Sequence, residues 1–146
     1  MRKRPLDIGV YAIVMRVTRS AGIGIGRLGS FEFQPGIYVY IGSALNSLPA
    51  RIARHFRQAK RSHWHIDYLT SADNVKMLGF AVRRSSRKIE CAMSRALQRN
   101  ALTSINRFGS SDCNCVSHLH RFANVPAAVH ALHKQRFRFS RAQDFA

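Results

Sequence analysis

Acidic residues are scarce in this chain: its 146 residues include 24 Lys and Arg but only seven Asp and Glu, a formal net charge of +17. An excess of one sign this large repels itself, and a polyanionic partner would relieve the repulsion. Arginine outnumbers lysine, and its planar guanidinium suits bidentate contact with phosphate. We therefore expect a nucleic acid as the partner. The alternative is a highly soluble or ribosome-associated protein.

Long apolar runs, a secretory signal and a cysteine framework are also missing. No apolar run approaches the roughly 18 residues that a membrane span needs, so we expect no membrane association. The basic start, MRKRPLDIG, is followed by no apolar region and is interrupted by Asp7, which argues against a secretory signal. The chain has three cysteines, and Cys113 and Cys115 are too close for a secreted disulfide framework. The expected location is cytoplasmic.

Several catalytic motifs are absent as well. The sequence holds no G-x-S-x-G, P-loop or H-E-x-x-H, and the GIGIG of residues 22–26 does not fit the dinucleotide-binding G-x-G-x-x-G. No linker or internal repeat divides the chain. With 46% hydrophobic residues, it is long enough to bury a single core.

Hydrophobic periodicity predicts both strands and helices. Strands are expected in residues 9–17, 37–43 and 75–84, with a second short strand and a turn in residues 21–30. Helices are expected from a cap at Asn46 or Ser47 to residue 61, in residues 63–69, in residues 85–100 behind a serine cap, and in residues 125–134. We predict an α+β fold, an α/β sandwich with a small, mostly antiparallel sheet flanked by helices.

A polar loop is expected in residues 106–120, where regular periodicity stops; long loops of this kind are often functional. It contains a C-x-C-x-x-H-x-H cluster of residue types that suit zinc. The four candidate ligands are Cys113, Cys115, His118 and His120. Their spacing is tighter than in usual zinc sites, so the alternative is a loop packed by small residues and hydrogen-bonding histidines.

Glu90 is the carboxylate that carries most weight. It lies at the edge of the apolar stripe of its predicted helix, a stripe formed by Ile89, Ala92, Met93, Ala96 and Leu97. One interpretation pairs Glu90 with Arg87 or Arg83. The other makes it a ligand for a hard cation such as Mg²⁺, which prefers few protein ligands with water and phosphate.

Tyrosines and a cationic cluster provide further candidates. Tyr38 and Tyr40 share one face of their predicted strand, since they are two residues apart. Strand tyrosines usually pack in a core, but a phenolic hydroxyl can also move a proton. Arg51 and His55 lie four residues apart on one helix face, and His63 and His65 follow. Such a cluster either binds phosphate without chemistry or stabilises charge at a reacting phosphate.

Taken in order, these motifs resemble a known family. YIGSA with the helix of Arg51, then HWHIDYL, then Glu90 with Cys91, then FGSSDCNCVSHLH, are similar to the small stand-alone, Uri-type branch of the GIY-YIG endonuclease superfamily. The resemblance covers about residues 9–122. By this analogy the GIY motif is GVY, residues 9–11, and YIG is residues 40–42. The GIY spelling at residues 36–38 is then a coincidence, and the long interval between the two motifs must form extra structure.

The resemblance implies metal-assisted hydrolysis of a DNA phosphodiester with one Mg²⁺ or Mn²⁺ held by Glu90. The implied catalytic residues are Tyr11, Tyr40, Arg51, His55 and Glu90. One tyrosine would activate the attacking water, and Arg51 would stabilise charge on the phosphate. For substrate contact we single out Ser43, Arg54, His65, Ser111 and Asp112.

The expected organisation is a GIY-YIG-like nuclease domain in residues 1–123 and a basic extension in residues 124–146. The alternative function is a non-catalytic nucleic-acid-binding protein that keeps this fold, with a Cys/His zinc site as a further variant.

Overall fold

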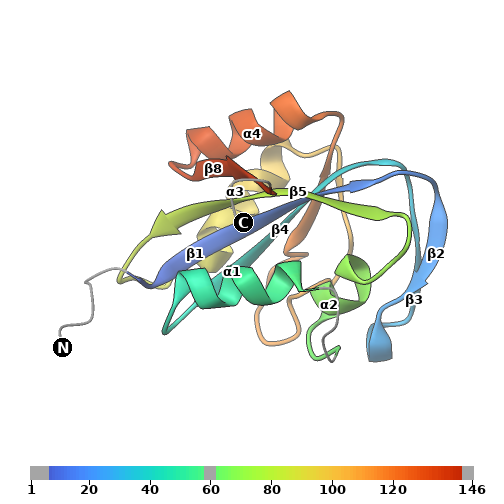
Figure 1. Cartoon of the computed structure of the whole chain (residues 1–146), viewed down its shortest axis with the longest axis horizontal. Coiled ribbons are helices and arrows are strands. Elements are labelled where there is room, and N and C mark those ends of the chain that lie inside the picture. The colour runs from blue at the N-terminus through green and yellow to red at the C-terminus, as the bar shows by residue number, and fades with distance from the viewer. Residues whose placement is uncertain (1–6, 58–61, 143–146) are drawn as a thin grey trace.

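A six-stranded antiparallel sheet organises the part of the chain that the computed structural model describes, residues 7–57 and 62–142 (Figure 1). Its strand order is β6-β7-β4-β1-β5-β8. The strands are β1 (Gly9–Val17), β4 (Gly36–Ala44), β5 (Val75–Arg84), β6 (Thr103–Ser104), β7 (Leu119–Phe122) and β8 (Arg138–Arg141). The predicted antiparallel sheet and α+β class are confirmed.

Helices cover both faces of this sheet, as the sandwich prediction requires (Figure 1). Helices α1 (Leu48–Phe56) and α2 (His65–Thr70) pack on one face, and α3 (Glu90–Asn100) and α4 (Val125–Lys134) pack on the other. Each face has its own hydrophobic core, because alternate residues of β1 point to opposite sides. Tyr11, Ile13 and Met15 face α1 and α2. Val10, Ala12 and Val14 face α3 and α4.

The segment between β1 and β4 forms the extra structure that the long interval predicted. Strands β2 (Ala21–Gly24) and β3 (Ser30–Phe33) pair with each other in a separate two-stranded sheet, joined by a short 3₁₀ helix, η1 (Gly26–Leu28). The connection leaves β1 and β4 directly paired along their whole length, from Gly9 opposite Ala44 to Val17 opposite Gly36. This register places Tyr11 opposite Gly42, which positions the candidate site described below.

The first residues of α1 and α3 compare differently with the prediction. Ser47 caps α1, since its side chain accepts a hydrogen bond from the N–H of Ala50 at 3.2 Å. This helix ends at Phe56, and residues 58–61 of the predicted helix lie outside the described residues. The predicted start of α3 at residue 85 is wrong: α3 begins at Glu90. Ser85 instead closes a tight turn, in which its hydroxyl oxygen accepts from the N–H of Arg87 at 3.0 Å.

The C-terminal segment packs on the same sheet as the rest of the chain. Asn124 caps α4 through a hydrogen bond from the N–H of Ala127 at 2.8 Å, which confirms the predicted helix. Strand β8 then pairs with the outer edge of β5, and Phe137 is buried in the core beneath α4. The predicted loop of residues 106–120 is too long at its end, because residues 119 and 120 belong to β7.

Candidate functional site

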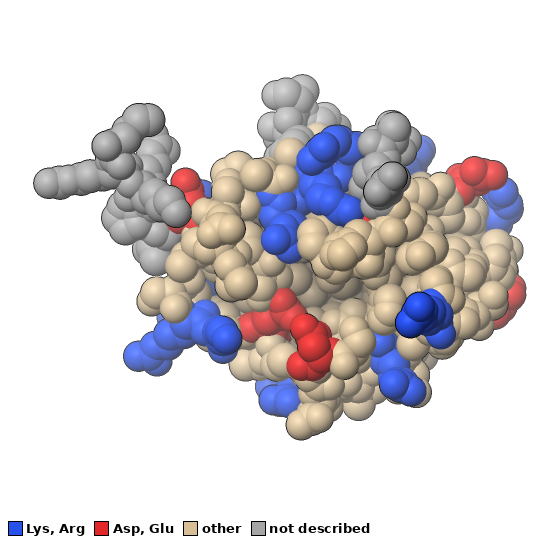
Figure 2. Space-filling view, turned by 90° about the horizontal axis from the view of Figure 1, so that it is seen from below, with Lys and Arg blue, Asp and Glu red and all other residues tan. Residues whose placement is uncertain are grey.

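A polar cleft opens where the C-terminal end of β4 meets α1, α2 and the first turn of α3. Its volume is about 290 Å³. The side chains and backbone that line it come from Tyr11, Tyr40, Gly42, Ser43, Arg51, His63, Trp64, His65, Glu90, Gly109, Ser111 and Asp112. On the face seen in Figure 2, acidic side chains gather near the middle, with Lys and Arg side chains around them. Such a surface can accept both a cation and the phosphates that accompany it.

At the base of the cleft, the Tyr11 hydroxyl lies 2.7 Å from Nε2 of His55, a buried residue of α1. The guanidinium of Arg51 lies near enough for its charge to act on the Tyr11 oxygen. The Tyr11 O–H donates to His55 in the tautomer whose Nε2 carries no hydrogen. Burial raises the pKa of Tyr11 well above its usual value, despite the opposing charge of Arg51. Tyr11 is therefore a neutral hydroxyl with a base directly behind it.

Gly42 makes the position of the Tyr11 ring possible. The ring lies across β4 at the place where Gly42 pairs with Tyr11, and a Cβ on Gly42 would collide with the Tyr11 hydroxyl. Only glycine leaves this space free. The glycine of the YIG motif thus has a steric role beside Tyr11.

Tyr40 and the loop that follows Phe108 form another wall of the cleft. Gly109, with φ of 69°, lies against the Tyr40 ring, and its N–H donates to Nδ1 of His65 at 2.9 Å. His65 thereby holds the loop that brings Ser111 and Asp112 to the cleft. Burial lowers the pKa of His65, which keeps Nδ1 available as an acceptor. Burial also raises the pKa of Tyr40 well above its usual value.

Two arginines of α1 pack on the chain's single tryptophan. The guanidinium carbons of Arg51 and Arg54 lie 4.6 Å and 4.2 Å from the Trp64 ring centroid, which are cation–π distances. Arg51 lines the cleft. Arg54 instead forms a bidentate ion pair with Asp67, at 2.8 Å and 3.0 Å. Trp64 was not singled out in the sequence, although a lone tryptophan between two histidines was a usable signal.

Asp67 is the anchor of this region. Its side chain has no exposed surface, and its Oδ2 accepts from the N–H groups of His63 and Trp64 at 2.8 Å and 2.9 Å. Burial alone would raise the pKa of Asp67, but the hydrogen bonds from Arg54, Trp64 and His63 lower it to about 2. The charged carboxylate therefore fixes the segment that carries the cleft residues His63 to His65.

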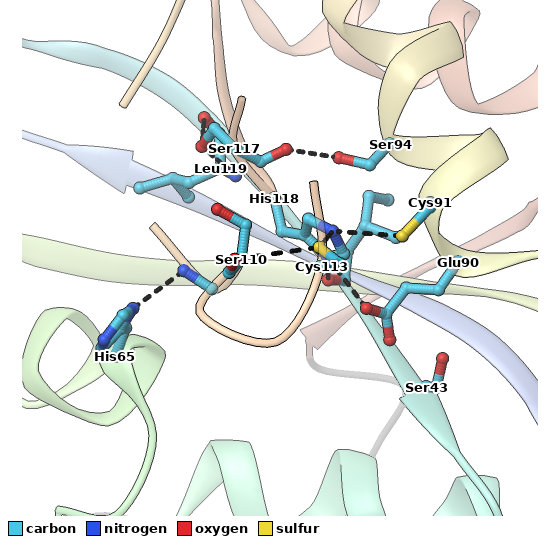
Figure 3. Close-up of polar contacts among 12 residues, drawn as sticks. Ser43, His65, Glu90, Cys91, Ser94, Ser110, Cys113, Ser117, His118 and Leu119 are labelled. Atoms are coloured by element: carbon cyan, nitrogen blue, oxygen red, sulfur yellow. Dashed lines mark hydrogen bonds and ion pairs between the residues drawn. The ribbon is translucent and has the colours of Figure 1, made fainter. Parts of the chain in front are cut away.

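Glu90 lies in the first turn of α3 and faces the cleft with 29% of its side chain exposed. The proposed pairing with Arg87 or Arg83 is wrong, because Oε2 of Glu90 lies 3.0 Å from Nδ1 of His118. The side chain of Ser43 lies near this carboxylate (Figure 3). Burial alone would raise the pKa of Glu90, but the contacts with His118 and Ser43 and the charge of Arg51 lower it. Glu90 is ionised at neutral pH.

Cys91, Cys113 and His118 lie beside Glu90 (Figure 3), and together with Cys115 they form a Cys₃His cluster. One potential ligand atom from each of Cys91, Cys113, Cys115 and His118 lies within 4.8 Å of the others. These atoms could hold a metal ion, and their donor types suit zinc better than Mg²⁺ or Mn²⁺. Cys91 was not predicted as a metal ligand, because it comes from α3 and not from the loop.

The assignment of His120 to this cluster is wrong. His120 lies between two serines: Nε2 is 2.7 Å from Oγ of Ser94, and Nδ1 is 2.7 Å from Oγ of Ser104. Burial, with a contribution from the charge of His118, lowers the pKa of His120 to about 4. His120 is therefore a neutral, hydrogen-bonded residue of the core.

The structure brings most of the predicted site residues to one place. The cleft is lined by eight of them, namely Tyr11, Tyr40, Ser43, Arg51, His65, Glu90, Ser111 and Asp112. His55 lies directly behind Tyr11. A hydroxyl with a base behind it, an ionised carboxylate and a guanidinium around one polar cleft can together bind a phosphate diester and move a proton.

Fold and cleft define a mixed α/β protein with a six-stranded antiparallel sheet, a small two-stranded sheet and a polar site at the end of the central strands. The chain belongs to the family described as domain of unknown function DUF123, whose family model matches residues 10–140. No curated protein and no solved structure matches the chain. Among the described residues, none of the helices is both long and apolar enough to cross a membrane.

Proposed function

We propose that this protein is a metal-dependent endonuclease of the GIY-YIG type that hydrolyses DNA phosphodiester bonds. The observation that carries the proposal is the meeting of Tyr11, Arg51 and Glu90 in one cleft, although they belong to β1, α1 and α3. These are the residues that the family resemblance assigns to proton transfer, charge stabilisation and metal binding. The net charge of +17 supports a polyanionic substrate.

The cleft offers the donors that a hard cation prefers. Glu90 is ionised and partly exposed, and Asp112 supplies a second carboxylate on the cleft wall. Mg²⁺ and Mn²⁺ favour one or two carboxylates, with water and phosphate completing the octahedron. Bound there, such a cation would supply Lewis-acid stabilisation of charge on the scissile phosphate and the leaving oxygen.

Tyr11 and His55 provide a path for the proton of the attacking water. As the water oxygen forms its bond to phosphorus, the water gives a proton to the Tyr11 oxygen, and the Tyr11 O–H proton moves to Nε2 of His55. The P–O bond to the leaving oxygen breaks, and this oxygen takes a proton from solvent. The 2.7 Å contact between Tyr11 and His55 supports this path, because the high pKa of Tyr11 makes a lone phenolate unfavourable.

Arg51 is placed to stabilise the charge that develops on the phosphate. Its guanidinium lines the cleft near Tyr11 and packs on Trp64. The ring limits the positions that the side chain can adopt, so little reorganisation is needed in the transition state.

The experiment is a survey of branched, single-stranded and double-stranded DNA with the purified full-length protein and Mg²⁺ or Mn²⁺. Glu90→Ala and Arg51→Ala should abolish cleavage while circular dichroism and thermal unfolding stay close to those of the wild type. A wild-type protein that cleaves none of these substrates with either metal would overturn the proposal. DNA binding that survives without any cleavage would support the non-catalytic alternative.

A further inference from the structure

All three cysteines of the chain converge on one histidine, although they lie in two separate parts of the sequence. Cys91 comes from the first turn of α3, while Cys113 and Cys115 come from the loop before β7. Sγ of Cys113 lies 3.5 Å from Nε2 of His118, and Sγ of Cys91 lies 3.9 Å from the same nitrogen. All three thiols are free of disulfide bonds.

The hydrogen bonds of His118 determine which of its nitrogens faces the thiols as an acceptor. Nδ1 lies 3.0 Å from Oε2 of Glu90 and 3.2 Å from the backbone oxygen of Ile41. Both partners only accept, so Nδ1 carries the hydrogen. Nε2 faces the sulfur atoms, and a metal ion would bind this nitrogen in place of a proton while Nδ1–H stays on Glu90.

The dimensions of the cluster fit a tetrahedral zinc ion. Zn–S bonds of about 2.3 Å and Zn–N bonds of about 2.0 Å place neighbouring ligand atoms about 3.5–3.8 Å apart. The four atoms here lie within 4.8 Å of one another, so the ligands would move by about 1 Å at most. Thiolate and imidazole ligands select zinc over Mg²⁺ and Mn²⁺, which prefer oxygen.

We propose that Cys91, Cys113, Cys115 and His118 bind one zinc ion in a closed, structural site. Four protein ligands fill the tetrahedron and leave no position for a reacting group. The ion would join α3, the loop and the start of β7. This link would hold the first turn of α3, where Ile89 provides no side-chain cap for the helix.

The zinc site would also position Glu90, a step that rests on the proposed function. With Nε2 on the metal, His118 keeps its Nδ1–H pointed at the Glu90 carboxylate, as histidine ligands of zinc commonly do. Glu90 and Cys91 are neighbours in α3, yet they would serve different metals, the hard cation on the carboxylate and zinc on the thiolate. His118 is then a positioning residue for Glu90.

The first test measures metal content and requires no activity assay. The full-length protein, produced with zinc supplied and purified without chelator, should contain about one zinc per chain by elemental analysis. Replacement of zinc by Co²⁺ in the wild type should give the visible bands of a tetrahedral site and strong thiolate-to-cobalt absorption in the near ultraviolet. Zinc content far below one per chain, or a cobalt spectrum without thiolate bands, would overturn the zinc site.

Variants separate the zinc site from the proposed nuclease. Cys113→Ser should lose most of the zinc, whereas Asn114→Ser, an exposed neighbour in the same loop, should keep it. Glu90→Gln should also keep its zinc, because Glu90 is not a ligand. Full zinc in Cys113→Ser would refute the ligand assignment. Full zinc in the wild type with no DNA cleavage would leave the zinc site standing and refute the nuclease.

The second test addresses His118 as a positioning residue. In ¹⁵N-histidine NMR spectra of the zinc-loaded protein, one histidine should show a protonated Nδ1 and a metal-bound Nε2, and Glu90→Gln should shift its Nδ1 resonance. Asp112→Asn, which changes an exposed carboxylate nearby, should leave that resonance in place. If the metal binds Nδ1, or if the Nδ1 resonance does not change in Glu90→Gln, His118 does not position Glu90.

Discussion

The chemistry of the cleft depends on the contacts of individual polar groups, and the Tyr11 hydroxyl is the clearest example. Tyr11 and Tyr38 are both buried tyrosines on the same face of the sheet. The Tyr11 hydroxyl contacts His55 in the cleft, whereas the Tyr38 hydroxyl donates to the backbone oxygen of Gln34 at 2.8 Å. The two residues therefore form a matched pair for mutation.

We predict that Tyr11→Phe lowers the cleavage rate by about 10²- to 10⁴-fold, the usual contribution of a positioned proton-transfer group. Tyr38→Phe removes an equivalent atom from the same core and should leave the rate within a few-fold of wild type. The measurement is the initial rate of DNA cleavage at saturating Mg²⁺. Equal losses in both variants would mean that Tyr11 acts through packing alone.

Asp67 makes a pH-dependent contribution to stability. Its pKa in the folded protein is about 2, below the ordinary value of 3.8. Stability from the charged carboxylate is thus fully present above about pH 4 and is lost as the pH falls towards 2. Relative to Asp67→Asn, the wild type should be more stable by roughly 1–2 kcal/mol at neutral pH, since solvent screens the partly exposed Arg54.

Urea denaturation of both proteins between pH 2 and pH 7 checks this prediction. The difference in unfolding free energy should shrink towards zero near pH 2. A difference that stays constant over this range would show that the charge of Asp67 does not stabilise the fold.

The two histidines near the start of β7 were both predicted as zinc ligands, but only one of them lies beside the cysteines. His118 and His120 are two residues apart, and both point towards α3. There His118 meets Cys91, and His120 meets Ser94, three residues further along the helix. Whether a histidine faces a thiol or a hydroxyl depends on this helix packing. Local spacing in the loop could not reveal it.

At the scale of elements, the pairing of β1 and β4 builds the site. Their register sets Tyr11 opposite Gly42, and the ring occupies the space that a side chain on Gly42 would need. The two motifs of the family resemblance therefore depend on each other sterically, even though residues 18–35 separate their strands.

We predict that Gly42→Ala destabilises the protein by about 1–3 kcal/mol, the usual cost of overpacking, and lowers cleavage more than this loss of stability explains. The added methyl would push the Tyr11 hydroxyl away from His55. Gly22→Ala is the control, because its Cβ would meet only an ordinary contact at 3.6 Å in β2. Thermal unfolding and cleavage rates of both variants provide the measurement. If Gly42→Ala behaves like Gly22→Ala, the steric role is refuted.

Most long elements and the short elements β2 and α2 were predictable, whereas the short strands β6, β7 and β8 were not. β1, β4 and β5 are long apolar strands, and α1 and α4 carry a capping residue followed closely by proline. β6 has only two residues and β7 four, too few for a periodic signal. Arginine and phenylalanine alternate in residues 136–139, at the start of β8, but the pairing of β8 with β5 is a long-range contact. The late start of α3 depends on the turn at Ser85, which competes with the helix.

For the whole molecule, the charge of +17 is the dominant property. It predicts binding to DNA that is driven by contacts with phosphates and release of counterions. Affinity for a short duplex should fall at least tenfold between about 50 and 200 mM salt. Glu90→Gln should bind with a similar salt dependence, because it leaves the Lys and Arg residues unchanged. Fluorescence anisotropy gives the affinities, and salt-independent binding would contradict a phosphate-based interaction.

The decisive measurement is Mg²⁺-dependent cleavage of a labelled DNA substrate by the wild type and by Glu90→Gln. We expect products with the wild type and Mg²⁺, none after chelation of Mg²⁺, and a loss of at least 100-fold in Glu90→Gln with unchanged circular dichroism and zinc content. Cleavage by Glu90→Gln at the wild-type rate would show that Glu90 has no part in the reaction.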